Sequence, residues 1–159
     1  MSKATKHSNL HWLWLSLAIV ILDQFTKWWV SRELILGELK QSTPFFDFVL
    51  AHNYGAAFSF LDIPGGLQRW LFAGISLVVS IVLIIWLRKT ASRIQSFCLA
   101  LVIGGAVGNL LGRAFSGYVV DFLSFHIGEH YWPAFNVADA AVCVGAVLLA
   151  LTFIFSKKS

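Results

Sequence analysis

Four stretches of this chain are each long and apolar enough to cross a lipid bilayer. They lie at about residues 12–32, 68–87, 94–114 and 136–155. The hydrocarbon core of a bilayer is about 30 Å thick, and a helix needs about 20 apolar residues to span it. The chain is 58% hydrophobic and only 13% charged, whereas soluble domains are about 25% charged. We therefore expect one integral membrane domain over residues 1–159, all-α in its membrane part, with four transmembrane helices.

The basic residues divide unevenly between the two ends of the predicted bundle. With four spans, three basic clusters share one side, namely Lys3 and Lys6, then Arg88, Lys89 and Arg93, then Lys157 and Lys158. Cytoplasmic loops of membrane proteins carry an excess of Lys and Arg. This pattern predicts a multi-pass protein with both termini in the cytoplasm. It also explains the net charge of +4 without a nucleic-acid partner.

Two segments lie on the opposite, outer side of the predicted bundle. Residues 37–67 contain short β-prone runs, at 45–50, 53–55 and 57–61, separated by Gly and Pro, which predicts a small β-sheet. Its aromatic residues suit the membrane surface. Residues 114–134 are expected to form a second outer loop.

Polar and ionisable residues collect near the outer ends of the apolar segments. They are Asn53, Asn109, Arg113, Asp121, Asn136 and Asp139. Each ionisable group at membrane depth costs about 2.5–3.5 kcal/mol on insertion scales, and such groups are usually functional. Two carboxyl groups in one site, Asp121 and Asp139, suggest acid/base hydrolysis.

Both aspartates also have simpler structural interpretations. Asn136 and Asp139 form an Asn-x-x-Asp pattern before an apolar run, which is typical of a helix capping box. Asp121 follows Gly117, which is expected to end the third helix, so Asp121 could be a solvated loop residue. The location of both carboxyl groups at the membrane favours the functional interpretation.

Arg113 and two further charged residues, Asp23 and Lys27, are close to polar partners in the sequence. Arg113 follows Asn109 by one helical turn, so both share a face. Arg113 is either an arginine that snorkels to the interface or a donor that positions a carbonyl or a carboxylate. Asp23 and Lys27 are also one turn apart, and we expect an ion pair between them.

A metal site is not expected, although one motif resembles one. His126-Ile127-Gly128-Glu129-His130 matches the H-x-x-E-H pattern of zinc proteases. That motif needs a helix, whereas Gly128 interrupts it and no helical periodicity surrounds it. We therefore predict neither a metal nor any other cofactor.

Several blocks along nearly the whole chain resemble the lipoprotein signal peptidases (signal peptidase II). In chain order they are Asp23-Gln24-Phe25-Thr26-Lys27, Asn53-Tyr54-Gly55-Ala56-Ala57-Phe58, Gly104-Gly105-Ala106-Val107-Gly108-Asn109 with Arg113, Val119-Val120-Asp121-Phe122, and Phe135-Asn136-Val137-Ala138-Asp139. The resemblance implies an intramembrane aspartic endopeptidase of a bacterial inner membrane. It would remove the signal peptide from diacylglyceryl-modified prolipoproteins, cutting before the lipidated cysteine at the periplasmic face.

The resemblance also assigns roles to residues. It implies Asp121 and Asp139 as the catalytic pair, and substrate-binding or supporting roles for Asn53, Gly55, Asn109, Arg113 and Asn136, with Asp23 and Lys27 as structural support. It implies a monomer in contact with membrane lipid that is inhibited by globomycin. The third-helix block departs from the family pattern, because Gly112 stands where an aspartate is usual. The loss of that aspartate is expected to free Arg113 or to remove a support at the helix end.

Two carboxyl groups that face each other across a water cannot both stay ionised, so they would share one proton. The amino terminus of the fourth helix favours the ionised form of Asp139. This predicts Asp139 as the base and Asp121 as the acid. The alternatives are a proton-coupled transporter, for which charges spread through the bilayer and broken-helix repeats are expected, and a non-catalytic membrane scaffold.

Overall fold

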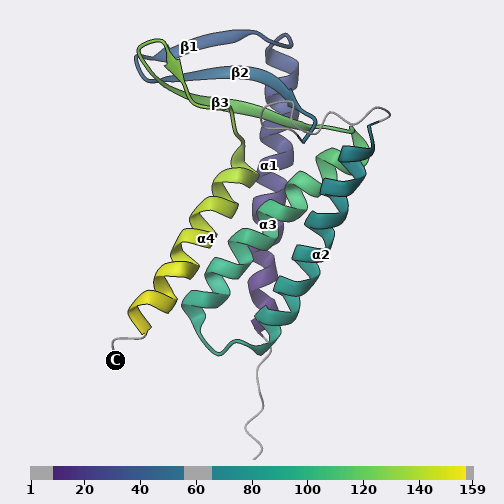
Figure 1. Cartoon of the computed structure of the whole chain (residues 1–159), viewed down its shortest axis with the longest axis vertical. Helices are drawn as coiled ribbons and strands as arrows, with labels where there is room; N and C mark the ends of the chain where they lie inside the picture. Colours follow the sequence, from purple (N-terminus) through teal and green to yellow (C-terminus); the bar gives the residue numbers. More distant parts are fainter. Residues whose placement is uncertain (1–8, 56–65, 157–159) are drawn as a thin grey trace, which may run out of the picture.

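The computed structural model describes residues 9–55 and 66–156. In this part of the chain, four helices form a bundle with a β-sheet across one of its ends (Figure 1). The helices are α1 (Leu13–Glu33, preceded by a short 3-10 turn at Asn9–Trp12), α2 (Leu67–Lys89), α3 (Arg93–Phe115) and α4 (Val137–Ser156). All four are long and apolar enough to cross a membrane. The prediction of four spans is confirmed, with each helix end within two residues of its expected place.

Helix α3 lies at the centre of the bundle and packs against α1, α2 and α4 (Figure 1). Its glycines allow this close approach. A Cβ atom on Gly104 would lie 2.9 Å from the carbonyl oxygen of Ser16 on α1, and one on Gly105 would overlap the carbonyl of Ala138 on α4. Small residues bring helix backbones together in membranes in this way. The packing fixes the outer ends of α1, α3 and α4 close to one another.

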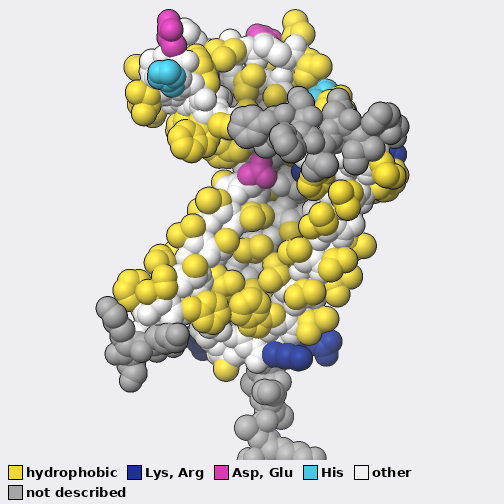
Figure 2. Space-filling view, viewed as in Figure 1, with side chains coloured by type: hydrophobic (Ala, Val, Ile, Leu, Met, Phe, Trp, Pro, Cys, Tyr) yellow, Lys and Arg dark blue, Asp and Glu magenta, His cyan; other side chains and the backbone are white. Residues whose placement is uncertain are grey.

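The outer surface of the bundle is an apolar coat suited to lipid. Large hydrophobic side chains are exposed along α1, α2 and α4, including Trp14, Ile21, Val78 and Ile154, and Figure 2 shows them covering the helices on one face. Basic side chains gather at the end opposite the sheet (Figure 2), where α2 ends at Lys89. This distribution is typical of a transmembrane domain.

The sheet has four antiparallel strands in the order β1-β2-β3-β4. They are β1 (Leu39–Thr43), β2 (Phe46–Asn53), β3 (Val119–Ile127) and β4 (His130–Tyr131). The small sheet expected within 37–67 is confirmed for β1 and β2, while the strand expected at 57–61 lies outside the described residues.

The second outer segment is not a loop, because it supplies β3 and β4. Residues 119–127 are rich in Val, Phe and Ile, which favour strands, and β3 pairs with β2 on both sides of an irregularity in the register between Phe48 and Ala51. The sheet is therefore larger than the sequence suggested, and Asp121 lies within a strand.

An apolar cluster fixes the sheet to the bundle. Val30 and Leu34 at the outer end of α1 are buried against Leu50 of β2 and Phe122 of β3, and Val137 at the start of α4 packs on the same cluster. Burial of such side chains stabilises the contact by about 1.5–3 kcal/mol each. The sheet is thus held over the ends of α1 and α4.

Candidate active site

Asp121 is the third residue of β3 and is only 3% exposed. Both of its carboxyl oxygens accept amide hydrogen bonds. Asn136 Nδ2 donates to Oδ1 over 2.6 Å, and Asn53 Nδ2 donates to Oδ2 over 3.0 Å. The register of β2 against β3 pairs Ala51 with Asp121, so Asn53 reaches it from two residues further along the neighbouring strand. Sheet pairing and the start of α4 together fix the orientation of this carboxyl group.

Asn53 is itself held in place by the turn that follows β2. The backbone N–H of Gly55 donates to Asn53 Oδ1 over 2.8 Å, which leaves the amide nitrogen free to point at Asp121. Gly55 has φ +109°, and a Cβ atom there would overlap the ring of Phe72 on α2. Only glycine combines that backbone conformation with so close an aromatic neighbour. Gly55 thus positions Asn53.

Replacement of Gly55 by alanine is expected to reduce activity strongly. The new methyl group would push the turn away from Phe72 and carry Asn53 off Asp121. Gly37→Ala is the matched control, because Gly37 also has a positive φ (+83°) but nothing lies within 4 Å of its Cβ position. We expect at least a tenfold greater loss of kcat/KM in Gly55→Ala than in Gly37→Ala, equivalent to about 1.4 kcal/mol. Equal losses would mean that backbone strain alone matters at Gly55.

Asp139 is in the first turn of α4 and belongs to a capping box. Its backbone N–H donates to Asn136 Oδ1 over 2.9 Å, and its Oδ2 accepts the backbone N–H of Asn136 over 3.3 Å. The structural interpretation of this Asn-x-x-Asp pattern is therefore confirmed. The cap does not use the whole side chain, because Oδ1 accepts a separate bond of 2.7 Å from Asn109 Nδ2 on α3. Capping and a chemical role are compatible at Asp139.

Two asparagines connect the carboxyl groups to each other. Asn109 donates to Asp139, Asn136 donates to Asp121, and Asn136 Nδ2 lies 3.4 Å from Asn109 Oδ1. Both asparagines are buried. Amide side chains can donate and accept at once, so this pair fixes the two aspartates relative to one another without adding charge.

A buried ion pair on α1 contacts this network on the side of the bundle interior. Lys27 Nζ lies 2.7 Å from Asp23 Oδ2 and donates to Asn109 Oδ1 over 3.0 Å. Asp23 is fully buried and its Oδ1 accepts the backbone N–H of Ala138 over 2.9 Å. The ion pair predicted for Asp23 and Lys27 is confirmed, and it ties α1 to α3 and α4.

Gln24 is a supporting residue that the sequence did not single out. Its Nε2 donates to Asp23 Oδ2 over 2.9 Å and to the carbonyl of Gly108 over 3.0 Å. The only indication in the sequence was an amide beside Asp23 in an apolar helix. Phe72, which packs on Gly55, carried no such indication.

Arg113 lies beside the two aspartates and close to the ring of Phe72, whose centroid is 5.6 Å from the guanidinium carbon. Its Nε atom is buried and makes no hydrogen bond within the described parts of the chain. At Gly112, a Cβ atom would lie 3.0 Å from the carbonyl oxygen of Tyr118. An aspartate at this position would therefore require the Tyr118 carbonyl, just before β3, to shift.

The surroundings of Asp121 favour its protonated form. Burial raises the pKa of Asp121 to about 6, and the nearby charge of Asp139 adds to this rise, while hydrogen bonds from Asn53 and Asn136 and the charge of Lys27 oppose it. A carboxyl group with a raised pKa beside a second carboxylate is typical of a site for proton transfer.

A groove opens beside Asp139. It has a volume of about 640 Å³ and runs from the β3–β4 end of the sheet along the first turns of α4, where Ala140, Cys143 and Val144 line it. Trp132 and Phe135 form its upper wall. Figure 2 shows acidic side-chain atoms exposed between the sheet and the helices. Among the residues that the structure describes, Asp139 is the one carboxyl group that lines this mostly apolar groove.

The two histidines of the H-x-x-E-H motif lie on a hairpin. His126 is in β3, His130 is in β4, and Gly128 is in the turn between them. The Nε2 atom of His126 lies 3.3 Å from Asp47 Oδ2. A helical motif is therefore absent from these residues, as the sequence predicted.

Comparison with known proteins agrees with this geometry. The family model described as signal peptidase (SPase) II matches residues 15–155. The chain belongs to the signal peptidase II family. Proteins named lipoprotein signal peptidase are similar over most of its length. The one from Cupriavidus taiwanensis is 51% identical and covers 88% of this chain and 80% of its own. The one from Teredinibacter turnerae is 45% identical, and the match covers 99% of this chain and 95% of that protein.

Solved structures show the same fold. A bacterial membrane enzyme crystallised by the in meso method superposes with a TM-score of 0.82 at 26% identity, over 92% of this chain and 89% of that one. A second structure described in the same way has a TM-score of 0.80 at 27% identity, over 90% and 92%. The helices and sheet of this signal peptidase II family member are thus those of a bacterial membrane enzyme.

Proposed function

We propose that this chain is an aspartic endopeptidase in which Asp121 and Asp139 are the catalytic pair. Family membership makes it a membrane protease that removes signal peptides from prolipoproteins. One observation carries the aspartic mechanism. Two carboxyl groups from different elements, β3 and α4, are connected through Asn136 and Asn109 at the junction of sheet and helices.

The two carboxyl groups have different surroundings, which suits different roles. Burial raises the pKa of Asp121 to about 6, so this residue is suited to hold the shared proton. Asp139 lies at the amino end of α4, where the helix dipole favours a carboxylate, and it accepts hydrogen bonds from Asn109 and the Asn136 backbone. We assign Asp139 as the general base and Asp121 as the general acid.

The reaction then needs only these groups and a water. Asp139 takes a proton from the water as its oxygen attacks the scissile carbonyl carbon. Protonated Asp121 donates a hydrogen bond to the carbonyl oxygen as it becomes negative. Collapse of the tetrahedral intermediate breaks the C–N bond, and the leaving nitrogen receives a proton from the pair. The products are a carboxylate on the signal peptide and the amino group of the next residue. No cofactor takes part in this scheme.

The groove beside Asp139 is the proposed substrate site. Its apolar wall along Ala140 and Val144 of α4 is continuous with the lipid-facing surface, so an acyl chain could enter from the bilayer. Trp132, which is 74% exposed, stands at its upper edge. Arg113 is positioned to hold a backbone carbonyl of the substrate through its guanidinium group. The substrate proposed on these grounds is a diacylglyceryl-modified prolipoprotein cut before its lipidated cysteine.

The basic clusters set the proposed orientation. Because Lys89 and Arg93 lie at the end of the bundle opposite the sheet, that end is cytoplasmic under the positive-inside rule. The sheet and the catalytic pair then face the periplasm of a bacterial inner membrane. We further propose that the protein acts as a monomer and that globomycin blocks it by occupying the groove.

The alternative functions gain no support. A transporter would need charges at several depths of the bilayer, whereas the charged and amide groups of this site lie between the middle of α1, at Asp23, and the sheet, and Leu13 to Leu22 of α1 carry no charge. A passive scaffold does not explain why the carboxyl groups of Asp121 and Asp139 are joined by a buried amide network.

The roles of the two aspartates can be separated by a pH–rate profile. With Asp121 as the acid, kcat/KM should fall as the pH rises through about 6, because the protonated form is lost. The hydrogen bond from Asn53 lowers the pKa of Asp121, so Asn53→Ala raises that pKa and moves the alkaline limb to higher pH. The control is Asn9→Ala, an amide at the far end of the bundle bonded to Thr90, which should leave both limbs in place. A shift of the acidic limb in Asn53→Ala would make Asp121 the base.

A further inference from the structure

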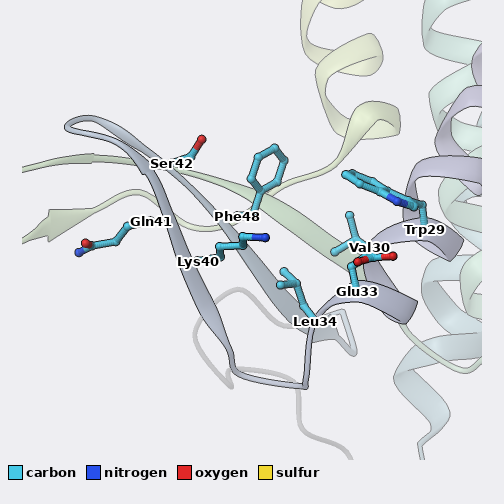
Figure 3. A pocket seen from close by; sticks show the side chains of 8 residues that line it. All are labelled: Trp29, Val30, Glu33, Leu34, Lys40, Gln41, Ser42 and Phe48. Atoms are coloured by element: carbon cyan, nitrogen blue, oxygen red, sulfur yellow. The ribbon is translucent and has the colours of Figure 1, made fainter.

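A second pocket lies between the outer end of α1 and the β1–β2 hairpin (Figure 3). Its volume is about 160 Å³, and it shares no lining residue with the groove beside Asp139. Trp29 and Glu33 line it from α1, Lys40 and Ser42 from β1, and Phe48 from β2. Nothing in the proposed cleavage reaction uses these residues.

The pocket carries opposite charges that do not pair with each other. Lys40 extends from β1 toward α1, and Glu33 lies beside Trp29 (Figure 3). Within residues 9–55 and 66–156, the ion pairs that form are Lys27 with Asp23 and His126 with Asp47. An ammonium group and a carboxylate that share one cavity without meeting are suited to a ligand that carries both charges.

The position of the pocket identifies the source of such a ligand. Trp28 and Trp29 are both about half exposed at the outer end of α1, and the guanidinium group of Arg32 lies 4.5 Å from the Trp28 ring centroid. Tryptophans with a neighbouring arginine mark the headgroup level of a bilayer. The pocket therefore opens where phospholipid headgroups lie.

The surface of α1 that runs from the pocket toward the middle of the helix is suited to the acyl chains of a lipid. Leu22, Phe25 and Trp29 follow one another at three- and four-residue spacing, which places them on one helix face. Leu22 and Phe25 are 52% and 58% exposed. An acyl chain could lie along this strip while the headgroup enters the pocket above it.

We propose that this pocket binds a phospholipid whose headgroup carries both a phosphate and a primary ammonium group, that is, a phosphoethanolamine lipid. Lys40 and the Ser42 hydroxyl receive the phosphate, and Glu33 receives the ammonium group through charge-assisted hydrogen bonds. Such a lipid links α1 to the hairpin that carries β2, and so supports the strand from which Asn53 reaches Asp121.

Lipid binding can be measured directly on the full-length protein by native mass spectrometry in detergent. Phosphatidylethanolamine, phosphatidylcholine and phosphatidylglycerol with identical acyl chains are titrated separately. We expect phosphatidylethanolamine to bind about tenfold more tightly than either of the others, as loss of one charge-assisted contact worth about 1.4 kcal/mol implies. Phosphatidylcholine lacks the N–H donors for Glu33, and phosphatidylglycerol lacks the cation.

Variants show whether the pocket is the site. Glu33→Gln should remove the preference for phosphatidylethanolamine, because it removes the partner of the ammonium group. Lys40→Gln should weaken the binding of all three phospholipids alike, because each of them carries the phosphate, whereas Lys40→Arg should keep the affinity of the parent protein. Glu129→Gln and Lys89→Gln change the same charges at positions that do not line the pocket and should bind as the parent protein does. Unfolding midpoints in lipid-free detergent show that each variant is folded.

Three results would overturn the proposal. The first is equal binding of all three phospholipids to the parent protein and to both glutamine variants. The second is equally strong competition by diacylglycerol, which has no charged headgroup. That result would show that the pocket recognises acyl chains alone. The third is tighter binding of phosphatidylglycerol that Glu33→Gln strengthens, which would make this an anion site. None of these experiments measures cleavage activity, so their outcome does not depend on the proposed peptidase function.

Discussion

Replacement of either Asp121 or Asp139 by asparagine is expected to abolish cleavage. The exchange keeps the size of the side chain and an oxygen for the amide network, but it removes the group that takes or gives a proton. Acid–base groups typically contribute about 10²–10⁴-fold to a rate, and because the two members act as one unit, we expect a loss of at least about 10³-fold in kcat/KM from either change. The measurement is a gel-shift assay in detergent with a lipid-modified prolipoprotein.

The chain offers a matched control for these variants. Asp47 is also a fully buried aspartate of the same sheet, and its carboxyl group faces His126 and the backbone of Ser42 and not the proposed site. Asp47→Asn should keep activity within about tenfold of the parent, that is, within about 1.4 kcal/mol. The aspartic mechanism is wrong if Asp121→Asn or Asp139→Asn, with an unchanged unfolding midpoint, retains activity comparable to Asp47→Asn.

Loss of Lys27 is expected to be the most destabilising single change at the site. Lys27→Met leaves Asp23, which is fully buried, without its countercharge and takes a donor from Asn109. Removal of one partner from a buried ion pair costs about 3–5 kcal/mol. The free energy of unfolding, measured by denaturant titration in detergent or bicelles, should fall by that amount. Lys89→Met, at the far end of α2, should change it by less than about 0.5 kcal/mol.

A double variant separates the ion pair from the hydrogen bonds. Asp23→Asn removes the second charge but keeps an oxygen for the backbone N–H of Ala138. Asp23→Asn combined with Lys27→Met should therefore be more stable than Lys27→Met alone, because no isolated charge stays buried. If the two single losses simply add in the double variant, Asp23 and Lys27 are not coupled and the contact contributes only hydrogen bonds.

The membrane part of the fold could be predicted from the sequence because bilayer thickness leaves few choices. Four runs of about 20 apolar residues gave helices whose ends agree with α1 to α4. The sheet was only half predicted. Strand β3 was missed because Gly117 and Asp121 suggested a solvated loop, whereas Val119–Ile127 had the composition of a strand and found its partner in β2, which is distant in sequence.

The candidate residues of the site could be selected from the sequence, but their connections could not be predicted. The polar side chains stood out against an apolar background, and all six come together at the sheet–helix junction. That Asn136 both caps α4 and bonds Asp121, or that Gly55, which lies against the Phe72 ring, orients Asn53, depends on contacts between distant segments. Spacing along a chain does not encode such contacts. The sequence left capping and a functional role of Asp139 as alternatives, whereas in the structure its carboxyl group caps α4 and also accepts a hydrogen bond from Asn109.

The amide network also bears on when the two carboxyl groups come together during folding. Asp139 is oriented by Asn109 of α3, Asp121 by residues of β2 and α4, and Lys27 of α1 joins them. No two consecutive segments contain the whole set, so the carboxyl groups come together only when α1, α3, α4 and the sheet have all packed. If Asp121 and Asp139 are the catalytic pair, as proposed above, an incompletely packed chain has no paired acid and base, and we expect it to be inactive.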